Sequence, residues 1–260
     1  MVNHKLISAA CIVLLLTITN AVHLPSSKEF TCNKTEKDTL NPNETIVIKT
    51  ITSVPLLRLA DYLCNQSETK EMKVKNFSIP SDYLYTHIYF AWKEADQYMS
   101  SVALKNDGQT DEIVGANLVL PIGILKDMYA PGKIGIILDF AMECYAWAKP
   151  QNVRNYSSPN AYVSILRGAD NVNVNQKLIR ETTKYFHISA QPETYHFVWE
   201  NSSPEQTNFM SSLNYTRIVC GDTKVEMNPC NWKKLGMDKL FAEQQCLYRI
   251  TNTGIKNNFY

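Results

Sequence analysis

The segment 133–149 constrains the fold most, because alternate residues along it form one continuous apolar face. Successive side chains of a β-strand point to opposite faces, so the pattern predicts a long, bulged core strand. A helix competes, since Ile134, Ile137 and Ala141 also recur at helical spacing. Gly135 and the isoleucines favour the strand. The predicted apolar face consists of Ile134, Ile136, Leu138, Phe140, Met142, Cys144, Ala146 and Ala148.

The best helix pattern begins at Ser81 or Asp82 and continues to a plausible end before Gly108. Apolar residues from Leu84 to Val102 recur every three or four positions, which is typical of a core-facing helix. Tyr89 and Phe90 fall off this stripe. They are the candidate exposed aromatic pair for a binding surface, although scattered apolar surface residues are normal.

Shorter patterns fill the rest of the chain. Apolar alternation with turn signals predicts several strands, and Pro121 marks 113–125 as an edge strand or two kinked pieces. Irregular alternation of helices and strands predicts an α+β fold: a single disulfide-bonded domain with a mainly antiparallel sheet and a long amphipathic helix. The predicted strands are 45–53, 72–79, 113–120, 122–125, 161–166, 185–189 and 195–199 (a hairpin around Pro192), and 212–220. Further predicted helices are 56–60, 171–184 and 232–244.

The first 21 residues have the pattern of a secretory signal peptide. His4 and Lys5 precede an apolar run, and Ala21 is a small residue before the expected cleavage site. The run is shorter than the ~20 residues that span a bilayer, and no later run is long enough. We therefore predict a signal peptide at 1–21 and a single secreted, extracellular domain at 22–260, without a membrane span.

The cysteines and sequons agree with secretion. An even number of cysteines after the leader favours three disulfides, with at least one pair among Cys220, Cys230 and Cys246. Their spacing does not suit zinc. The six cysteines are Cys32, Cys64, Cys144, Cys220, Cys230 and Cys246. The candidate glycosylation sites are Asn33, Asn43, Asn65, Asn76, Asn155, Asn201 and Asn214.

The charge balance and the absent motifs exclude several classes of function. The chain has 26 Lys+Arg and 25 Asp+Glu without a basic stripe, so nothing indicates nucleic-acid binding. Zinc-protease, nucleophile-elbow and phosphate-loop motifs are absent from the sequence, and no cofactor or metal is predicted. The candidate acid/base pairs for a hydrolase are Asp139/Glu143, Glu94/Asp96 and Glu193/Glu200. The histidines that could form a metal site are His23, His87, His187 and His196. Any acid-rich chain offers such pairs, and each histidine suits a structural role, so we predict no catalytic residue.

One resemblance suggests a biological setting. Three features carry it: Tyr89-Phe90-Ala91-Trp92-Lys93, the stretch from Leu120-Pro121-Ile122-Gly123 to Ala130-Pro131-Gly132, and the scattered sequons. Over about residues 80–170 these features resemble the salivary immunosuppressant glycoproteins of hard ticks. The resemblance implies suppression of host lymphocyte responses, and no functional residue is carried over from it. A viral cytokine-binding glycoprotein has the same general features.

The function predicted from the sequence is therefore that of a secreted, host-modulating glycoprotein that is not an enzyme. Its expected partner is a host protein or a leukocyte surface component. The alternatives are a secreted hydrolase with an unrecognised site and a small-ligand carrier with an apolar cavity.

Overall fold

The computed structural model describes residues 45–69, 81–106, 111–125, 127–128, 132–149, 161–169, 171–221, 223, 228–236 and 243–253. All of them belong to the second of two units in the chain, Cys32–Tyr260, and the first unit is Met1–Thr31. The predicted leader, Cys32 and the predicted strand at 72–79 lie outside the described residues.

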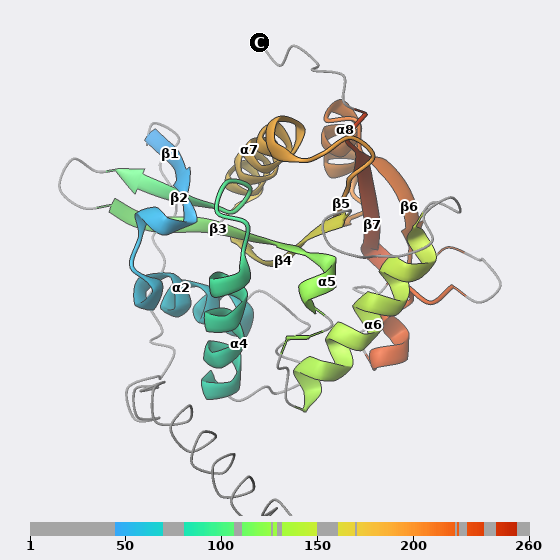
Figure 1. Cartoon of the computed structure of the whole chain (residues 1–260), viewed down its shortest axis with the longest axis horizontal. Helices are drawn as coiled ribbons and strands as arrows, with labels where there is room; N and C mark the ends of the chain where they lie inside the picture. The colour runs from blue at the N-terminus through green and yellow to red at the C-terminus, as the bar shows by residue number, and fades with distance from the viewer. Residues whose placement is uncertain are drawn as a thin grey trace, which may run out of the picture. The chain divides into compact units, whose positions relative to one another are not determined.

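A seven-stranded sheet forms the centre of the second unit, in the order β1-β2-β3-β4-β5-β7-β6 (Figure 1). Five of its six neighbouring pairs are antiparallel, and only β4 and β5 are parallel. The predicted α+β class with a mainly antiparallel sheet is confirmed. The strands are β1 (Thr45–Thr50), β2 (Ser101–Asn106), β3 (Asp111–Pro121), β4 (Ala161–Ala169), β5 (Tyr195–Asn201), β6 (Thr216–Cys220) and β7 (Gln245–Thr251).

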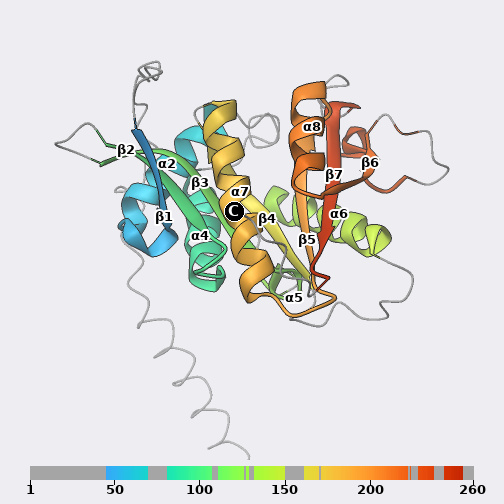
Figure 2. The ribbon, with the colours of Figure 1, turned by 90° about the horizontal axis from the view of Figure 1, so that it is seen from above.

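Helices cover both faces of the sheet. Helices α7 (Val172–Ser189) and α8 (Pro204–Ser212) lie on one face (Figures 1 and 2). Helices α2 (Leu56–Thr69), α4 (Ser81–Glu94), α5 (Ile122–Leu125) and α6 (Lys133–Ala148) lie on the other. Two short 3-10 helices, η1 (Ile51–Ser53) and η2 (Trp232–Leu235), complete the elements. Among the described residues, no helix is both long and apolar enough to cross a bilayer.

Covering both faces explains the apolar run in β3. Eight consecutive residues of this strand are buried, and a strand that is covered on both sides reads as continuous hydrophobic sequence instead of alternating. The prediction of an edge strand was wrong, because β3 pairs with both β2 and β4. Pro121 is tolerated because it is the last residue of the strand, and the predicted strand at 122–125 is the helix α5.

The predicted strand at 133–149 was wrong as well: this segment is the helix α6. Ile134, Ala141, Tyr145 and Ala148 are buried at helical spacing, whereas Ile136, which a strand would bury beside Ile134, is 51% exposed. The alanines, Met142 and Glu143 favour a helix, and they outweigh Gly135 and the β-branched isoleucines.

The helix that begins at Ser81 is shorter than predicted. It ends at Glu94, and the apolar residues around Val102 belong to the strand β2. Asp96 stabilises the intervening turn, since its Oδ1 accepts hydrogen bonds of 2.9 Å from the backbone amides of Tyr98 and Met99. A turn-forming aspartate therefore interrupts a pattern that otherwise continues at helical spacing.

The predicted hairpin around Pro192 was also wrong. Residues 185–189 form the last turn of α7, whose predicted start was confirmed: the Asn171 side chain caps the helix by accepting from the Val174 amide at 3.0 Å. Because β5 runs parallel to β4, the connection between them needs a crossover, and α7 provides it. The sequence analysis missed α8, although Ser203 caps it and Pro204 begins it.

Two cysteine pairs lie at disulfide distance. Cys220 in β6 and Cys246 in β7 have a Cα–Cα separation of 4.0 Å, which agrees with the predicted pair among the last three cysteines. Cys144 in α6 pairs with Cys230, at a Cα–Cα separation of 5.0 Å, and so ties α6 to the segment before η2. Cys64 is buried in α2.

Helix α7 packs tightly against the sheet at Gly115 in β3. A Cβ atom there would lie 2.5 Å from Val174 Cγ1 and 2.9 Å from Leu178 Cδ1, and valine is stiff within a helix. We expect Gly115→Ala to lower the free energy of unfolding by about 1–3 kcal/mol in urea titrations, because overpacking strains the core. Combining it with Val174→Ala should give a loss smaller than the sum of the two single losses. Additive losses would show that the two side chains do not meet.

His87 in α4 gives stability a pH dependence. The ring is 5% exposed, and burial lowers its pKa from 6.5 to about 4. Between these values the unfolded chain binds a proton that the folded chain does not, so stability falls as the pH drops from 6.5 to 4. We expect this residue to contribute at most about 3 kcal/mol to the fall.

Urea titrations of His87→Phe between pH 7 and pH 4 measure this contribution, since the variant should have a flatter stability profile than the parent. His187→Gln serves as the comparison and should flatten the profile less. His187 is half-buried, and the lowering of its pKa by desolvation is opposed by a hydrogen bond with Asn252. Equal slopes for the parent and His87→Phe would contradict the assignment.

Candidate active site

The strands β4 and β5 separate shortly after they pair. Their ladder contains three residue pairs and ends at Val163 and Phe197. Beyond this point β4 continues to Ala169 and β5 to Asn201 without pairing to each other, and Figure 2 shows the two strands spreading apart. We call this region the β4–β5 divergence. It comprises Ser164 and Ile165 of β4 and Val198, Trp199 and Glu200 of β5.

A β-bulge lies where the ladder ends. On the other side of β4, Val119 of β3 pairs with Ser164 and Leu118 pairs with Leu166, so Ile165 is an extra residue without an opposite partner. A bulge bends its strand and increases the local twist. The bulge at Ile165 therefore gives a physical reason for β4 to leave β5 at Ser164.

A chain of hydrogen bonds begins at this point, on the α7 side of the sheet. Ser164 Oγ lies 3.1 Å from His196 Nε2, and His196 Nδ1 lies 2.7 Å from the Tyr215 hydroxyl. The Tyr215 hydroxyl lies 3.2 Å from Thr183 Oγ1, which donates to the Ile179 carbonyl at 2.7 Å. The chain thus links β4, β5, the residue preceding β6, and α7.

A buried carboxylate stands farther along β5 on the same side of the sheet. Glu200 is 6% exposed, and both of its oxygens lie 3.4 Å from Asn175 Nδ2 of α7. Positions 196 and 200 are four residues apart, or about 13 Å along a strand. The α7 side of the divergence therefore has a hydroxyl–imidazole pair at one end and a carboxylate at the other.

Aromatic side chains fill the opposite side, beneath α6. Tyr145 of α6 packs against Phe197, with ring centroids 5.4 Å apart, and accepts a hydrogen bond of 3.2 Å from Trp199 Nε1. Trp199 in turn meets Trp232 at 5.1 Å, and Trp232 meets Phe140 at 4.8 Å. Burial raises the pKa of Tyr145, and the hydrogen bond from Trp199 opposes this shift. This side is apolar, and the Cys144–Cys230 pair holds its wall in place.

The start of α7 follows β4 directly. Its N-cap, Asn171, uses its side chain on the Val174 amide, and residues 171–173 are exposed. The sequence 170–176 contains one acid, Asp170, and neither a glycine nor a basic residue. The nearest basic residues along the chain are Arg167 and Lys177.

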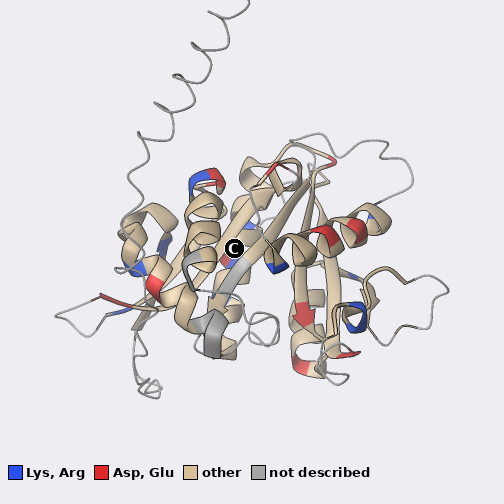
Figure 3. Cartoon of the chain, turned by 90° about the horizontal axis from the view of Figure 1, so that it is seen from below, with Lys and Arg blue, Asp and Glu red and all other residues tan. Residues whose placement is uncertain are grey.

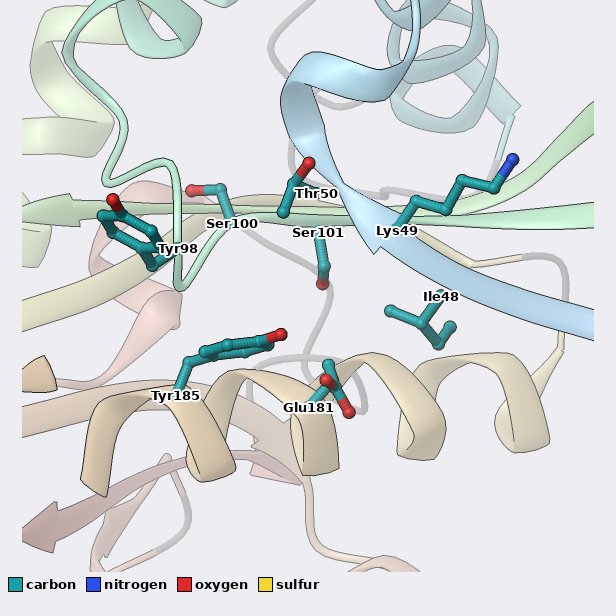
Figure 4. A pocket seen from close by; sticks show the side chains of 8 residues that line it. All are labelled: Ile48, Lys49, Thr50, Tyr98, Ser100, Ser101, Glu181 and Tyr185. Carbon is teal, nitrogen blue, oxygen red and sulfur yellow. The ribbon is translucent and has the colours of Figure 1, made fainter. Parts of the chain in front are cut away.

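One small cavity lies elsewhere, between β1, the start of β2 and α7 (Figure 4). Its volume is about 30 Å³, which suits one or two water molecules. None of its lining residues belongs to β4 or β5, and it cannot hold a substrate. The lining residues are Ile48, Lys49, Thr50, Tyr98, Ser100, Ser101, Glu181 and Tyr185.

The structure places the three acid pairs considered from the sequence in different surroundings. Asp139 and Glu143 are exposed one turn apart on α6, where Figure 3 shows acidic segments along the helix. Glu94 is exposed, whereas Asp96 forms the turn after α4. Of the third pair, Glu193 is an exposed loop residue with a φ of 66°, and Glu200 is buried in β5.

The candidate histidines lie on three separate elements. His87 is in α4, His187 in α7 and His196 in β5, and His23 lies outside the described residues. No group of His, Cys, Asp and Glu side chains in the described part of the chain could hold a metal ion. Among the three described histidines, His196 is the one that is hydrogen-bonded to a polar side chain of the divergence, Ser164.

The predicted surface residues have mixed exposure. Tyr89 and Phe90 are half-buried and contact each other edge to face, at 5.6 Å between ring centroids. Asn201 and Asn214 are exposed, whereas Asn65 is buried in α2, which does not favour a glycan there. The other candidate glycosylation sites, Asn33, Asn43, Asn76 and Asn155, lie outside the described residues.

Sequence reasoning missed Ser164 and Tyr215 altogether. They are 51 positions apart, and no local motif connects them. His196 was assigned a structural role, and Glu200 was considered only with Glu193. The missing signal is the bulge at Ile165, which depends on the pairing of β3 with β4 and leaves no mark in the sequence.

Comparisons with known proteins place the fold. No protein-family model and no curated protein sequence match this chain. Solved structures do match. A mosquito arylalkylamine N-acetyltransferase-like protein has a TM-score of 0.54 at 14% identity, covering 80% of this chain and 100% of its own. An agmatine N-acetyltransferase has a TM-score of 0.53 at 16% identity, covering 79% and 99% respectively. Arylalkylamine N-acetyltransferase 2 of Aedes aegypti has 0.51 at 13% identity, covering 80% and 99%.

These matches overturn two predictions. The predictions of a host-modulating binding protein and of a chain that is not an enzyme were wrong, because the similar solved structures are N-acetyltransferases or N-acetyltransferase-like. None of the comparisons bears on secretion, glycosylation or the resemblance to tick salivary glycoproteins, which stay predictions. The chain has the fold of the N-acetyltransferases.

Proposed function

We propose that this chain transfers an acetyl group to an amine at the β4–β5 divergence. The observation that carries the proposal is the bulge at Ile165, which separates two parallel strands beside a serine, a histidine and a buried carboxylate. The similarity to the agmatine and arylalkylamine enzymes supports it through the fold alone.

The separated strands suit acyl transfer chemistry. Beyond Val163, β4 is not paired with β5. Backbone amides of β4 that point toward β5 in this region therefore make no ladder hydrogen bond with it. Fixed backbone N–H groups can stabilise the negative charge that develops on an acyl oxygen during attack. The aromatic wall beneath α6 limits the access of water from the other side, which strengthens such electrostatic interactions.

Glu200 is our candidate for recognising the acceptor. A carboxylate binds a positively charged group through charge-assisted hydrogen bonds, and an amine carrying a second positive charge offers such a group. Because Glu200 stands about 13 Å along β5 from His196, it suits the far end of an acceptor whose amine lies near Ser164. A diamine is favoured over a monoamine on this basis.

The residues present do not fit an acetyl donor anchored by a diphosphate, such as a coenzyme A thioester. Helix N-termini bind phosphate through free amides, usually with close backbone approach. Here the Val174 amide already donates to the Asn171 side chain. Residues 170–176 contain no glycine, and Asp170 adds a negative charge. We therefore assign no residue to a nucleotide and consider donors with a short thioester.

The place of action is a separate proposal. The leader pattern over 1–21, the sequons and the two cysteine pairs at disulfide distance support a secreted glycoprotein. An oxidising compartment would keep α6 attached through Cys144 and Cys230. A transferase in that compartment would meet few nucleotide-bound donors, which is consistent with the poor fit at α7.

The role of Glu200 can be tested by acceptor selectivity. The purified chain is assayed for transfer from S-acetyl-N-acetylcysteamine to agmatine, which carries a second cation, and to tryptamine, which does not. We expect Glu200→Gln to lower kcat/KM for agmatine by about 30-fold, the equivalent of about 2 kcal/mol, because a buried charge pair is lost. The value for tryptamine should change less than about 3-fold.

The matched control is Glu143→Gln, which removes an exposed carboxylate from α6 and should leave both values unchanged. If the parent chain acetylates neither amine, the proposed function is wrong. Equal losses for the two amines in Glu200→Gln would instead remove only the role assigned to Glu200.

A further inference from the structure

The chain of hydrogen bonds at the β4–β5 divergence has one consistent direction. Thr183 has a single hydroxyl hydrogen, which it donates to the Ile179 carbonyl. At the contact between Thr183 and Tyr215 the hydrogen must therefore come from Tyr215. The tyrosine has no further hydrogen, so at its 2.7 Å contact with His196 the imidazole Nδ1–H is the donor.

This direction fixes the tautomer of the neutral imidazole. A ring protonated at Nδ1 has its lone pair on Nε2, and Nε2 faces Ser164 Oγ at 3.1 Å. Ser164 consequently donates its hydrogen to the histidine. A hydroxyl, a base and a group that orients the base form the arrangement that activates a nucleophile.

The first three residues of this hydrogen-bond chain differ in their exposure. Ser164 is 8% exposed, Tyr215 4% and His196 0%. Ser164 is therefore the most exposed of the three residues, and it is also the first β4 residue beyond the β4–β5 ladder. The base and its orienting group are shielded from water inside the core.

We propose that Ser164 accepts the acyl group before the amine does, with His196 as its base and Tyr215 as a positioning residue. This inference rests on the proposed function and adds a covalent acyl-enzyme to it. Transfer then proceeds in two steps through an ester on Ser164.

In the first step, Ser164 Oγ attacks the carbonyl carbon of the acyl donor, and its proton moves to His196 Nε2. The carbon–sulfur bond of the thioester breaks as the tetrahedral intermediate collapses. The leaving thiolate takes the proton from Nε2, which leaves a neutral thiol, a neutral imidazole and Ser164 as its acyl ester.

In the second step, the amine attacks the ester carbonyl and gives its proton to His196 Nε2. The bond between the carbonyl carbon and Ser164 Oγ breaks, and the oxygen regains the proton from Nε2. The products are an amide and the original hydroxyl. Throughout both steps the Nδ1–H of the imidazole stays hydrogen-bonded to Tyr215, which opposes rotation of the ring.

The test measures the covalent intermediate directly. The full chain is mixed with p-nitrophenyl acetate without an amine, and nitrophenolate release and intact mass are followed together. We expect a burst of about one nitrophenolate per chain, with one acetyl group on Ser164 by peptide mapping, that disappears when agmatine is added. Ser164→Ala should abolish the burst, and His196→Gln should slow it at least about 100-fold.

Two further variants separate chemistry from structure. Ser101→Ala removes another buried serine, whose hydroxyl lacks a hydrogen-bond partner among the described residues, and should retain the full burst. Tyr215→Phe should slow acylation without changing the KM for the donor, because it loosens the base and not the donor site. Only variants with the circular dichroism spectrum of the parent are compared.

The outcomes distinguish this inference from the proposed function. Amine acetylation by the parent with no acetyl group on Ser164, and with Ser164→Ala as active as the parent, would overturn the covalent step and leave the transferase standing. Acetylation of Ser164 without transfer to any amine would support the nucleophile and overturn the proposed function. Retention of the burst by Ser164→Ala would also overturn the inference.

Discussion

The β-bulge at Ile165 is the constraint on which the rest of the proposed site depends. Two parallel strands joined by the crossover helix α7 would ordinarily pair along their whole length. Their facing N–H and C=O groups would then be hydrogen-bonded to each other. One extra residue in β4 ends that pairing at Val163 and Phe197. The chemistry proposed here uses what the bulge leaves available, namely backbone amides without a ladder partner and the Ser164 hydroxyl beside them.

The two sides of the divergence have opposite characters, and both follow from how the helices are held. On the α7 side, the Thr183 hydroxyl donates to the Ile179 carbonyl, and this bond sets the direction of the hydrogen bonds from His196 to Tyr215 and from Tyr215 to Thr183. On the α6 side, aromatic rings exclude water, and a disulfide to Cys230 fixes the helix there. A chain of hydrogen bonds with one direction, beside aromatic side chains that exclude water, suits proton transfer coupled to acyl transfer.

The sequence predicted the sheet better than the site. The sequence predicted strands at β1, β4 and β5, and β1 alternates because it is an edge strand, but the pattern of 133–149 favoured a strand where tertiary packing produces the helix α6. The parallel pairing of β4 with β5 depends on a crossover that no local pattern encodes. The site was not predictable for the same reason: Ser164, His196 and Tyr215 meet only through sheet register and the bulge.

Deletion of Ile165 tests the central claim most directly, since it removes the bulged residue and lets β4 pair regularly with β3. The acetyl transfer rate from S-acetyl-N-acetylcysteamine to agmatine is compared between the parent and the deletion variant, after matching circular dichroism spectra establish that both are folded. We expect the folded variant to lose at least about 100-fold in rate, because the strands no longer separate beside Ser164. A folded deletion variant that transfers acetyl groups as fast as the parent would contradict the account.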